Sequence, residues 1–184
     1  ERLCGLADSR EARTALLYGV TGSGKTEVFL RTIRHVLDGG RGVIMMVPEI
    51  SLTPQMIDRF RRYFGGRVAV LHSGLSMTER LDEWKRIKNG GASIVVGTHS
   101  AVFAPMENIG LIVIDEEQEG TYKSEMSPRY HARDVARFRA AQEGALLLLA
   151  SATPSVESFY RAREGRYELL TLKNRYGAAR LPDV

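Results

Sequence analysis

A glycine-rich segment near the start of the chain has the spacing of a phosphate-binding loop. Residues 19–26 read Gly-Val-Thr-Gly-Ser-Gly-Lys-Thr and match the pattern G-x-x-x-x-G-K-[ST]. Glycine is required where phosphate oxygens crowd the backbone, because a Cβ atom would clash there. Backbone N–H groups of such a loop, and of the helix after it, supply positive partial charge. The segment predicts a nucleotide site built from Gly19, Val20, Thr21, Gly22, Ser23, Gly24, Lys25 and Thr26.

Two side chains of this loop have distinct predicted roles. Lys25 would reach the β- and γ-phosphates, and the Thr26 hydroxyl would be a ligand of Mg²⁺. The alternative is a glycine-rich turn that matches the pattern by chance. An apolar run before the loop and a helical apolar period after it argue against that alternative.

A second candidate site follows an apolar run that ends in acids. Residues 111–118 read Leu-Ile-Val-Ile-Asp-Glu-Glu-Gln. Neighbouring carboxylates repel one another and are costly to desolvate without a cation, which nucleotide-bound Mg²⁺ would supply. We predict that Asp115 lies on the metal side, that Glu116 orients and activates the attacking water, and that Glu117 is structural. Lys25, Asp115 and Glu116 form the predicted catalytic set, and a solvated acidic loop is the alternative.

The elements around these sites alternate between short apolar runs and segments of helical period. The near-continuous apolar runs are typical of parallel strands covered on both faces, so the chain is predicted to be one three-layer α/β domain over residues 1–184. In such sheets ligands bind at the carboxyl ends of the strands. The predicted strands are 15–18, 42–47, 67–71, 93–96, 111–115, 146–150 and 167–172, and the predicted helices are 25–37, 52–64, 78–88, 133–142 and 156–163.

Composition excludes several classes of protein. The 184 residues are 43% hydrophobic and 26% charged, as in ordinary globular domains. The single cysteine, Cys4, excludes a disulfide framework or a cysteine-rich zinc site within the chain and favours a reducing compartment. No apolar run approaches about 18 residues, and no signal segment begins the chain, so we expect a cytoplasmic protein without a membrane partner. The net charge of +4 is compatible with a nucleic-acid surface but does not establish one.

The acidic box and a later polar stretch resemble motifs of superfamily 2 helicases. Asp-Glu-Glu-Gln follows one apolar run, and Ser-Ala-Thr at 151–153 follows the next. In that superfamily the Ser-Ala-Thr stretch links the nucleotide site to the DNA cleft. The resemblance therefore implies coupling through Gln118, Ser151, Ala152 and Thr153.

A fuller resemblance is to the primosomal protein N′ (PriA) family of bacterial replication-restart helicases. It implies a RecA-like ATP-binding lobe that uses ATP and Mg²⁺ to unwind DNA at stalled forks for primosome assembly. The implied partners are single-stranded and forked DNA, the single-strand DNA-binding protein and primosome proteins. The segments that carry the resemblance are 19–27, 47–53, 72–76, 97–105, 122–123, 129–134 and 174–176.

Several of these segments follow predicted strands and should share the carboxyl edge of the sheet. Small polar and backbone groups there can bind DNA phosphates, and aromatic rings can stack on bases. Histidines held in loops, and tyrosines packed on the domain, are the alternatives left open, and we expect Arg133, Arg137 and Arg139 to form a solvated helix face. The predicted DNA contacts are Pro48, Glu49, His72, Ser73, Gly74, Thr98, His99, Ser100, Tyr122, Lys123, Arg129 and Tyr130.

Two departures from the family pattern limit what is expected of this chain. Gln118 stands where the family commonly has His, which puts the coupling of DNA binding to hydrolysis in doubt. The adenine-recognising glutamine motif, the second lobe with its arginines, and the zinc-binding insertion are expected outside the chain. We therefore expect weak nucleotide binding and slow or absent hydrolysis by the chain alone. The alternatives are another superfamily 2 translocase, a P-loop small-molecule kinase, or a nucleotide-regulated DNA-binding adaptor.

Overall fold

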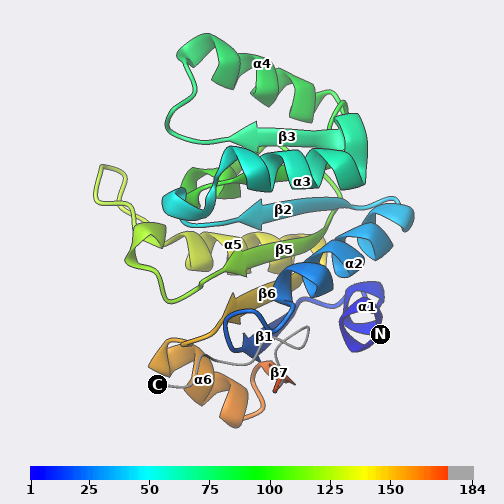
Figure 1. Cartoon of the computed structure of the whole chain (residues 1–184), viewed down its shortest axis with the longest axis vertical. Helices are drawn as coiled ribbons and strands as arrows, with labels where there is room; N and C mark the ends of the chain where they lie inside the picture. Colours follow the sequence, from blue (N-terminus) through cyan, green and yellow to red (C-terminus); the bar gives the residue numbers. More distant parts are fainter. Residues whose placement is uncertain (174–184) are drawn as a thin grey trace, which may run out of the picture.

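The structure, a computed structural model, describes residues 1–173, and these form a seven-stranded sheet in the order β3-β4-β2-β5-β6-β1-β7 (Figure 1). Every pairing between these strands is parallel, which confirms the predicted α/β fold. The family-like segment Asn174, Arg175 and Tyr176 lies outside the described residues. The strands are β1 (Arg13–Gly19), β2 (Gly42–Met46), β3 (Val68–Leu71), β4 (Ile94–Gly97), β5 (Ile109–Asp115), β6 (Leu146–Ser151) and β7 (Glu168–Leu172).

Helices cover both faces of the sheet and complete the three layers. Apolar residues of α1, α2 and α3 pack in one core on one face, and those of α4, α5 and α6 pack in a second core on the other. Alternate residues of a strand point to opposite faces, so Leu16 joins one core while Ala15 and Leu17 join the other. The helices are α1 (Arg2–Asp8), α2 (Lys25–Asp38), α3 (Pro54–Phe64), α4 (Met77–Lys88), α5 (Ala132–Glu143) and α6 (Val156–Arg163), with 3-10 turns η1 (Glu49–Ser51), η2 (Gly65–Arg67), η3 (His99–Phe103) and η4 (Gly120–Tyr122).

Helix boundaries differ from the predicted ones where a capping residue decides the start. The helix predicted from Leu52 begins at Pro54, because the Thr53 hydroxyl caps it by accepting a hydrogen bond from the Met56 N–H at 3.2 Å. Helix α1 was not predicted. It places Leu3, Leu6 and Ala7 against the core, but its seven residues make only about two turns, too few to establish a helical period.

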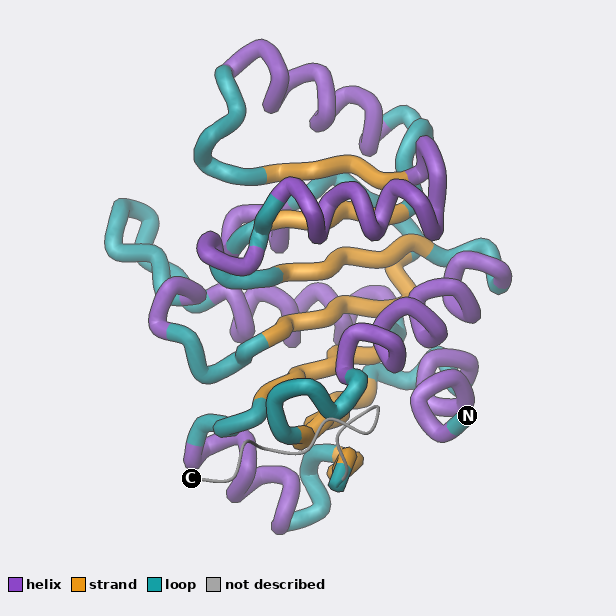
Figure 2. The backbone as a smooth tube through the Cα atoms, in the orientation of Figure 1, coloured by secondary structure: helices purple, strands orange, loops and turns teal. Residues whose placement is uncertain are grey.

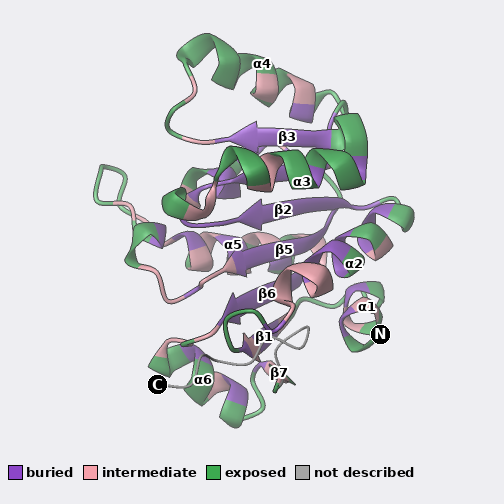
Figure 3. Cartoon of the chain, viewed as in Figure 1, coloured by how far each residue is buried: buried purple, intermediate pink, exposed green. Residues whose placement is uncertain are grey.

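The parallel arrangement gathers the loops that follow the strands at one edge of the sheet, the left edge in Figure 2. Strands β1 to β6 are mostly buried and β7 is only partly buried, whereas much of this loop edge is exposed (Figure 3). All predicted functional segments therefore share one rim of the domain. Within residues 1–173 there is no helix with both the length and the apolar character needed to cross a bilayer.

Candidate nucleotide and nucleic-acid site

The predicted phosphate loop connects β1 to α2, as the pattern requires. Gly22 has a φ of 77° and Gly24, the residue before α2, a φ of 89°, a backbone conformation that favours glycine. No side chain among residues 1–173 caps the start of α2. The N–H groups at this helix end are therefore free to bind an anion.

The structure brings the loop lysine to the acidic box. Lys25 Nζ donates a 2.8 Å hydrogen bond to the Gly19 carbonyl and lies 3.8 Å from Glu116 Oε1. A cavity of about 380 Å³ is lined by residues 21–27 of the loop and helix, by Arg59, and by Asp115 and Glu116. The predicted catalytic residues thus converge on one hollow large enough to accept phosphate groups.

Glu116 has an uncommon backbone conformation at this point. Its φ is 47°, in the left-handed region that residues other than glycine seldom adopt. In this geometry its N–H donates a 3.0 Å hydrogen bond to Asp115 Oδ1. Local strain of this kind concentrates at functional sites.

Burial and, to a lesser extent, the nearby Glu116 carboxylate raise the pKa of Asp115 to about 6, while the Glu116 N–H and Lys25 oppose the shift. A cation beside Asp115 would relieve this charge. The Thr26 hydroxyl and the Asp115 carboxylate are hard oxygen donors on the same cavity, and such donors together with phosphate oxygens suit Mg²⁺. Thr26 and Asp115 are therefore suitable ligands for the Mg²⁺ ion that the sequence implied.

Arg59 is a site residue that the sequence interpretation missed. It lies on α3 and lines the phosphate cavity, although it is far from the loop in sequence. Among residues 1–173 its side chain makes no ion pair or hydrogen bond, so its charge is free for a ligand. The sequence has three arginines on this helix, and only the packing of α3 shows which one faces the cavity.

A short chain of hydrogen bonds leads from the acidic box to the Ser-Ala-Thr stretch. Gln118 Nε2 donates to Glu116 Oε2 at 3.1 Å, and Ser151 Oγ donates to Gln118 Oε1 at 2.5 Å. The Thr153 N–H in turn donates to Ser151 Oγ at 2.8 Å. Gln118 thus makes the contact to residues 151–153 that the sequence had left open.

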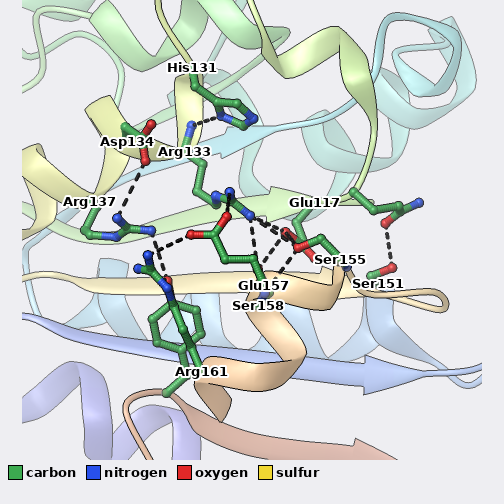
Figure 4. Close-up of polar contacts among 12 residues, drawn as sticks. Glu117, His131, Arg133, Asp134, Arg137, Ser151, Ser155, Glu157, Ser158 and Arg161 are labelled. Carbon is green, nitrogen blue, oxygen red and sulfur yellow. Dashed lines mark hydrogen bonds and ion pairs between the residues drawn. The ribbon is translucent and has the colours of Figure 1, made fainter. Parts of the chain in front are cut away.

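Glu117 is the buried hub beside this chain of bonds (Figure 4). It is 2% exposed and accepts hydrogen bonds from Arg133 Nη1 at 3.1 Å, from the Ser155 N–H at 2.7 Å and from Ser158 Oγ at 2.9 Å. Arg133 also pairs with Glu157 at 2.8 Å. Glu117 therefore ties the acidic box to α5 and to the start of α6, which confirms its predicted structural role.

The prediction that the arginines of α5 form a solvated face is wrong. Arg139 donates to the carbonyls of Val102, Ala104 and Met106, and Arg137 donates to the Tyr167 hydroxyl at 3.0 Å. Arg133 is held by Glu117, as described above. The reason is that α5 is flanked by η3 and by the end of α6, so carbonyls and acids surround its arginines.

Most predicted DNA-side residues lie at the loop edge with accessible side chains. Of the twelve, six are exposed, namely Glu49, Ser73, Gly74, Ser100, Lys123 and Arg129, and three are half-buried, namely His72, His99 and Tyr130. His72 Nδ1 accepts a 3.1 Å hydrogen bond from the Gly74 N–H, and His99 Nδ1 lies 3.3 Å from Glu49 Oε1. His72 is thus held within its own loop and His99 by the neighbouring loop after β2, and both still reach the surface.

Three predicted DNA contacts are wrong for this conformation, because the side chains of Pro48, Thr98 and Tyr122 are buried. Pro48 and Thr98 lie where β2 and β4 run into η1 and η3, under the residues that are exposed. The Tyr122 ring is 1% exposed, and its hydroxyl lies 3.2 Å from the Met46 carbonyl and 2.5 Å from the Asp115 carbonyl. A base cannot stack on this ring; instead, Tyr122 anchors the loop that follows it to the acidic strand.

That loop, residues 123–131, closes as a small hairpin. Lys123 and His131 form an antiparallel bridge, and the Ser124 N–H donates to the Tyr130 carbonyl at 2.8 Å. The Tyr130 ring packs edge-on against Phe103, with 4.8 Å between ring centroids. The hairpin therefore presents Lys123 and Arg129 to solvent beside η3.

The model of the DEAD/DEAH box helicase family matches residues 6–161. The chain belongs to the DEAD/DEAH box helicase family. Membership in this helicase family implies use of a nucleotide, in agreement with the cavity described above. It does not favour the P-loop kinase that the phosphate loop alone had left open.

Individual helicase relatives support the predicted resemblance. The chain is 54% identical to the "Replication restart protein PriA" of Bacillus subtilis (strain 168) over 177 residues, and 47% identical to that of Treponema pallidum (strain Nichols) over 176 residues. Both alignments cover 96% of this chain but only 22% and 27% of the relatives. The chain thus spans about a quarter of the length of these relatives, and the predicted resemblance to the PriA family is confirmed.

Solved helicase structures have the same fold. RecG bound to a three-way DNA junction is similar with a TM-score of 0.63 and 25% identity, covering 93% of this chain and 22% of that one. The Hef helicase domain of Pyrococcus furiosus has a TM-score of 0.63 at 20% identity, over 94% of this chain and 37% of that one. The RecA-like helicase lobe predicted from the sequence is therefore confirmed.

Proposed function

We propose that the chain is the ATP-binding motor lobe of a DNA helicase that unwinds DNA at stalled replication forks for primosome assembly and replication restart. The observation that carries this proposal is that Lys25, Asp115 and Glu116 line one cavity. Gln118 connects this cavity to the Ser-Ala-Thr stretch, because it is hydrogen-bonded to both Glu116 and Ser151. The similarity to replication restart proteins supports the choice of process.

Each residue of the cavity has a role in this proposal. The N–H groups of the loop and Lys25 hold the β- and γ-phosphates. Thr26 and Asp115 hold Mg²⁺, which supplies charge neutralisation at the phosphates when it is bound. Glu116 positions and accepts a proton from the attacking water. Arg59 faces the same cavity and provides a second cation for the phosphates.

The exposed loop edge is the proposed surface for single-stranded and forked DNA. Ser73 and Ser100 offer hydroxyl groups for phosphates, Gly74 adds no side chain that would block an approach, and Lys123 and Arg129 offer charge. Two chains of contact lead from this edge to the acidic box, one through Ser151 and Gln118, the other through Tyr122. DNA bound at the edge would thereby influence Asp115 and Glu116. The resemblance further implies partnership with the single-strand DNA-binding protein and primosome proteins.

ATP turnover by the full-length protein, measured with and without forked DNA, tests this proposal. We expect strong stimulation by DNA, and we expect Ser151→Ala to reduce the stimulation while leaving the affinity for ATP unchanged. The matched control is Ser9→Ala, which changes an exposed serine that does not line the nucleotide cavity. Turnover that ignores DNA in the parent protein would exclude the helicase assignment.

A further inference from the structure

A second cavity, of about 180 Å³, lies between α4 and η3 and shares no residue with the phosphate cavity. It is lined by Leu71, His72, Arg80, Trp84, Ser100, Phe103 and Ala104. Leu71 and Ala104 are buried and form the apolar floor, whereas Arg80 and Ser100 are exposed. The hollow therefore combines an apolar base with polar groups at its rim.

Two aromatic rings wall this cavity and remain partly in water. Trp84 is 39% exposed and Phe103 is 53% exposed. Large rings left open beside a hollow are typical of surfaces that bind a ligand. Trp84 also carries a cation, because Lys88 Nζ lies 5.0 Å from the centre of its ring.

The cavity adjoins the proposed DNA edge. His72 follows β3 and Ser100 lies in η3, and both belong to segments proposed to bind the DNA backbone. The hairpin residue Tyr130 packs against Phe103, so three aromatic side chains lead from the hairpin to α4. Helix α4 presents its outer side to solvent at this end of the sheet (Figure 3).

The charges around the rings favour an anionic chain. Two acidic side chains of α4 interact within their own helix. Glu79 forms a capping box with Ser76, and Glu83 forms an ion pair with Arg86 at 3.1 Å. The Arg80 side chain makes no hydrogen bond or ion pair among residues 1–173 and lines the cavity. A guanidinium that can bind a phosphate thus lies beside two partly exposed rings, which is the combination used by single-strand binding sites.

We propose that the cavity between α4 and η3 binds a nucleobase of single-stranded DNA, which stacks on Trp84 while Arg80 binds a neighbouring phosphate. The proposal rests on the proposed function and extends the DNA surface beyond the loop edge to α4. Stacking does not depend on base identity, so the site would hold the strand without reading its sequence.

The only tryptophan of the chain reports on this cavity directly. Its fluorescence is followed during titration of the chain with oligothymidylate and with a base-free oligomer of the same deoxyribose phosphates. We expect quenching by oligothymidylate and little change with the base-free oligomer. Trp84→Ala should weaken oligothymidylate binding by about tenfold, equal to about 1.4 kcal/mol.

Control variants separate stacking from damage to the fold. Trp84→Phe retains a ring and should keep most of the affinity, and Tyr160→Ala, which removes an exposed ring on α6, should keep all of it. Oligothymidylate binding with unchanged fluorescence and unchanged affinity in Trp84→Ala would overturn the nucleobase site and leave the proposed function standing. If neither oligomer binds, the proposed DNA surface of the chain is itself refuted.

Discussion

Glu117 and Arg133 form a buried ion pair, with 3.1 Å between Oε2 and Nη1 and side-chain exposures of 0% and 12%. The pair joins the acidic box to α5, and the same carboxylate accepts the Ser155 N–H at the start of α6. It therefore fixes the position of the residues on either side of it, Glu116 and Gln118.

Removal of this carboxylate should be costly. Glu117→Ala leaves Arg133 and the Ser155 N–H without their buried acceptor, and breaking such a pair costs about 3–5 kcal/mol. Denaturant unfolding should show this loss in the free energy of unfolding. Glu157→Gln is the matched control, because Glu157 is half-exposed and its pair with Arg133 should contribute no more than about 1 kcal/mol. Equal losses in the free energy of unfolding for the two substitutions would contradict the central structural role of Glu117.

The stability of the domain should depend on pH through Asp115. Its pKa is raised to about 6, so the folded chain holds this proton more tightly than the unfolded chain. The resulting stabilisation is complete below about pH 4 and is lost as the pH rises through about 6. Asp115→Asn should therefore raise the free energy of unfolding by about 1–3 kcal/mol at pH 7.5 and by little at pH 4.5.

A second substitution checks the cause of this shift. Glu116→Gln removes a neighbouring charge that raises the pKa of Asp115, so the titration midpoint of Asp115 should fall. Carboxyl NMR measures that midpoint directly. A stabilisation by Asp115→Asn that is the same at both pH values would show that ionisation is not its source.

Arg59 should contribute to phosphate binding. Arg59→Ala is expected to weaken binding of a magnesium nucleoside triphosphate by about tenfold, or about 1.4 kcal/mol, because an arginine donates charge-assisted hydrogen bonds to phosphate. Arg62→Ala is the control, since Arg62 lies on the same helix but does not line the cavity. Calorimetric titration of both variants makes the comparison. An identical loss of affinity in both variants would show that the effect comes from the change in net charge and not from a contact of Arg59 with the phosphates.

The Tyr122 hydroxyl should stabilise the acidic strand. Tyr122→Phe removes its contacts with the Met46 and Asp115 carbonyls, which should lower the free energy of unfolding by about 1–2 kcal/mol. Tyr160→Phe, at an exposed ring, should change it by less than about 0.5 kcal/mol. Thermal or denaturant unfolding of the two variants separates a buried hydroxyl contact from a general effect of the substitution.

The sequence was sufficient to predict the sheet and the chemistry at its edge. Continuous apolar runs marked the strands to within two residues at every end, because buried parallel strands tolerate little else. The phosphate loop and the acidic box were identified by spacing, since their chemistry needs those residue types in that order. Both kinds of signal are local, so no knowledge of the packing was needed.

What escaped prediction depends on contacts between distant elements. The burial of Tyr122 follows from its reach to Met46 on β2, and the role of Arg133 follows from the approach of α6. Arg59 differs from Arg61 and Arg62 only in the direction that α3 gives it. The helical period of apolar residues predicts a helix and its buried face. It does not predict which other elements contact the remaining faces of that helix.

The order of the strands sets a condition on how the protein is made. Strand β1 pairs only with β6 and β7 among the described strands, so Arg13 is matched with Leu146 and Ala15 with Glu168. On the ribosome, β1 and the phosphate loop are translated before β2 to β5, and both partners of β1 are translated after them. Such distant pairing is slow and leaves strand edges open to wrong partners. In a nascent chain, the strand before the glycine-rich loop therefore has no pairing partner until residues 146–172 have emerged.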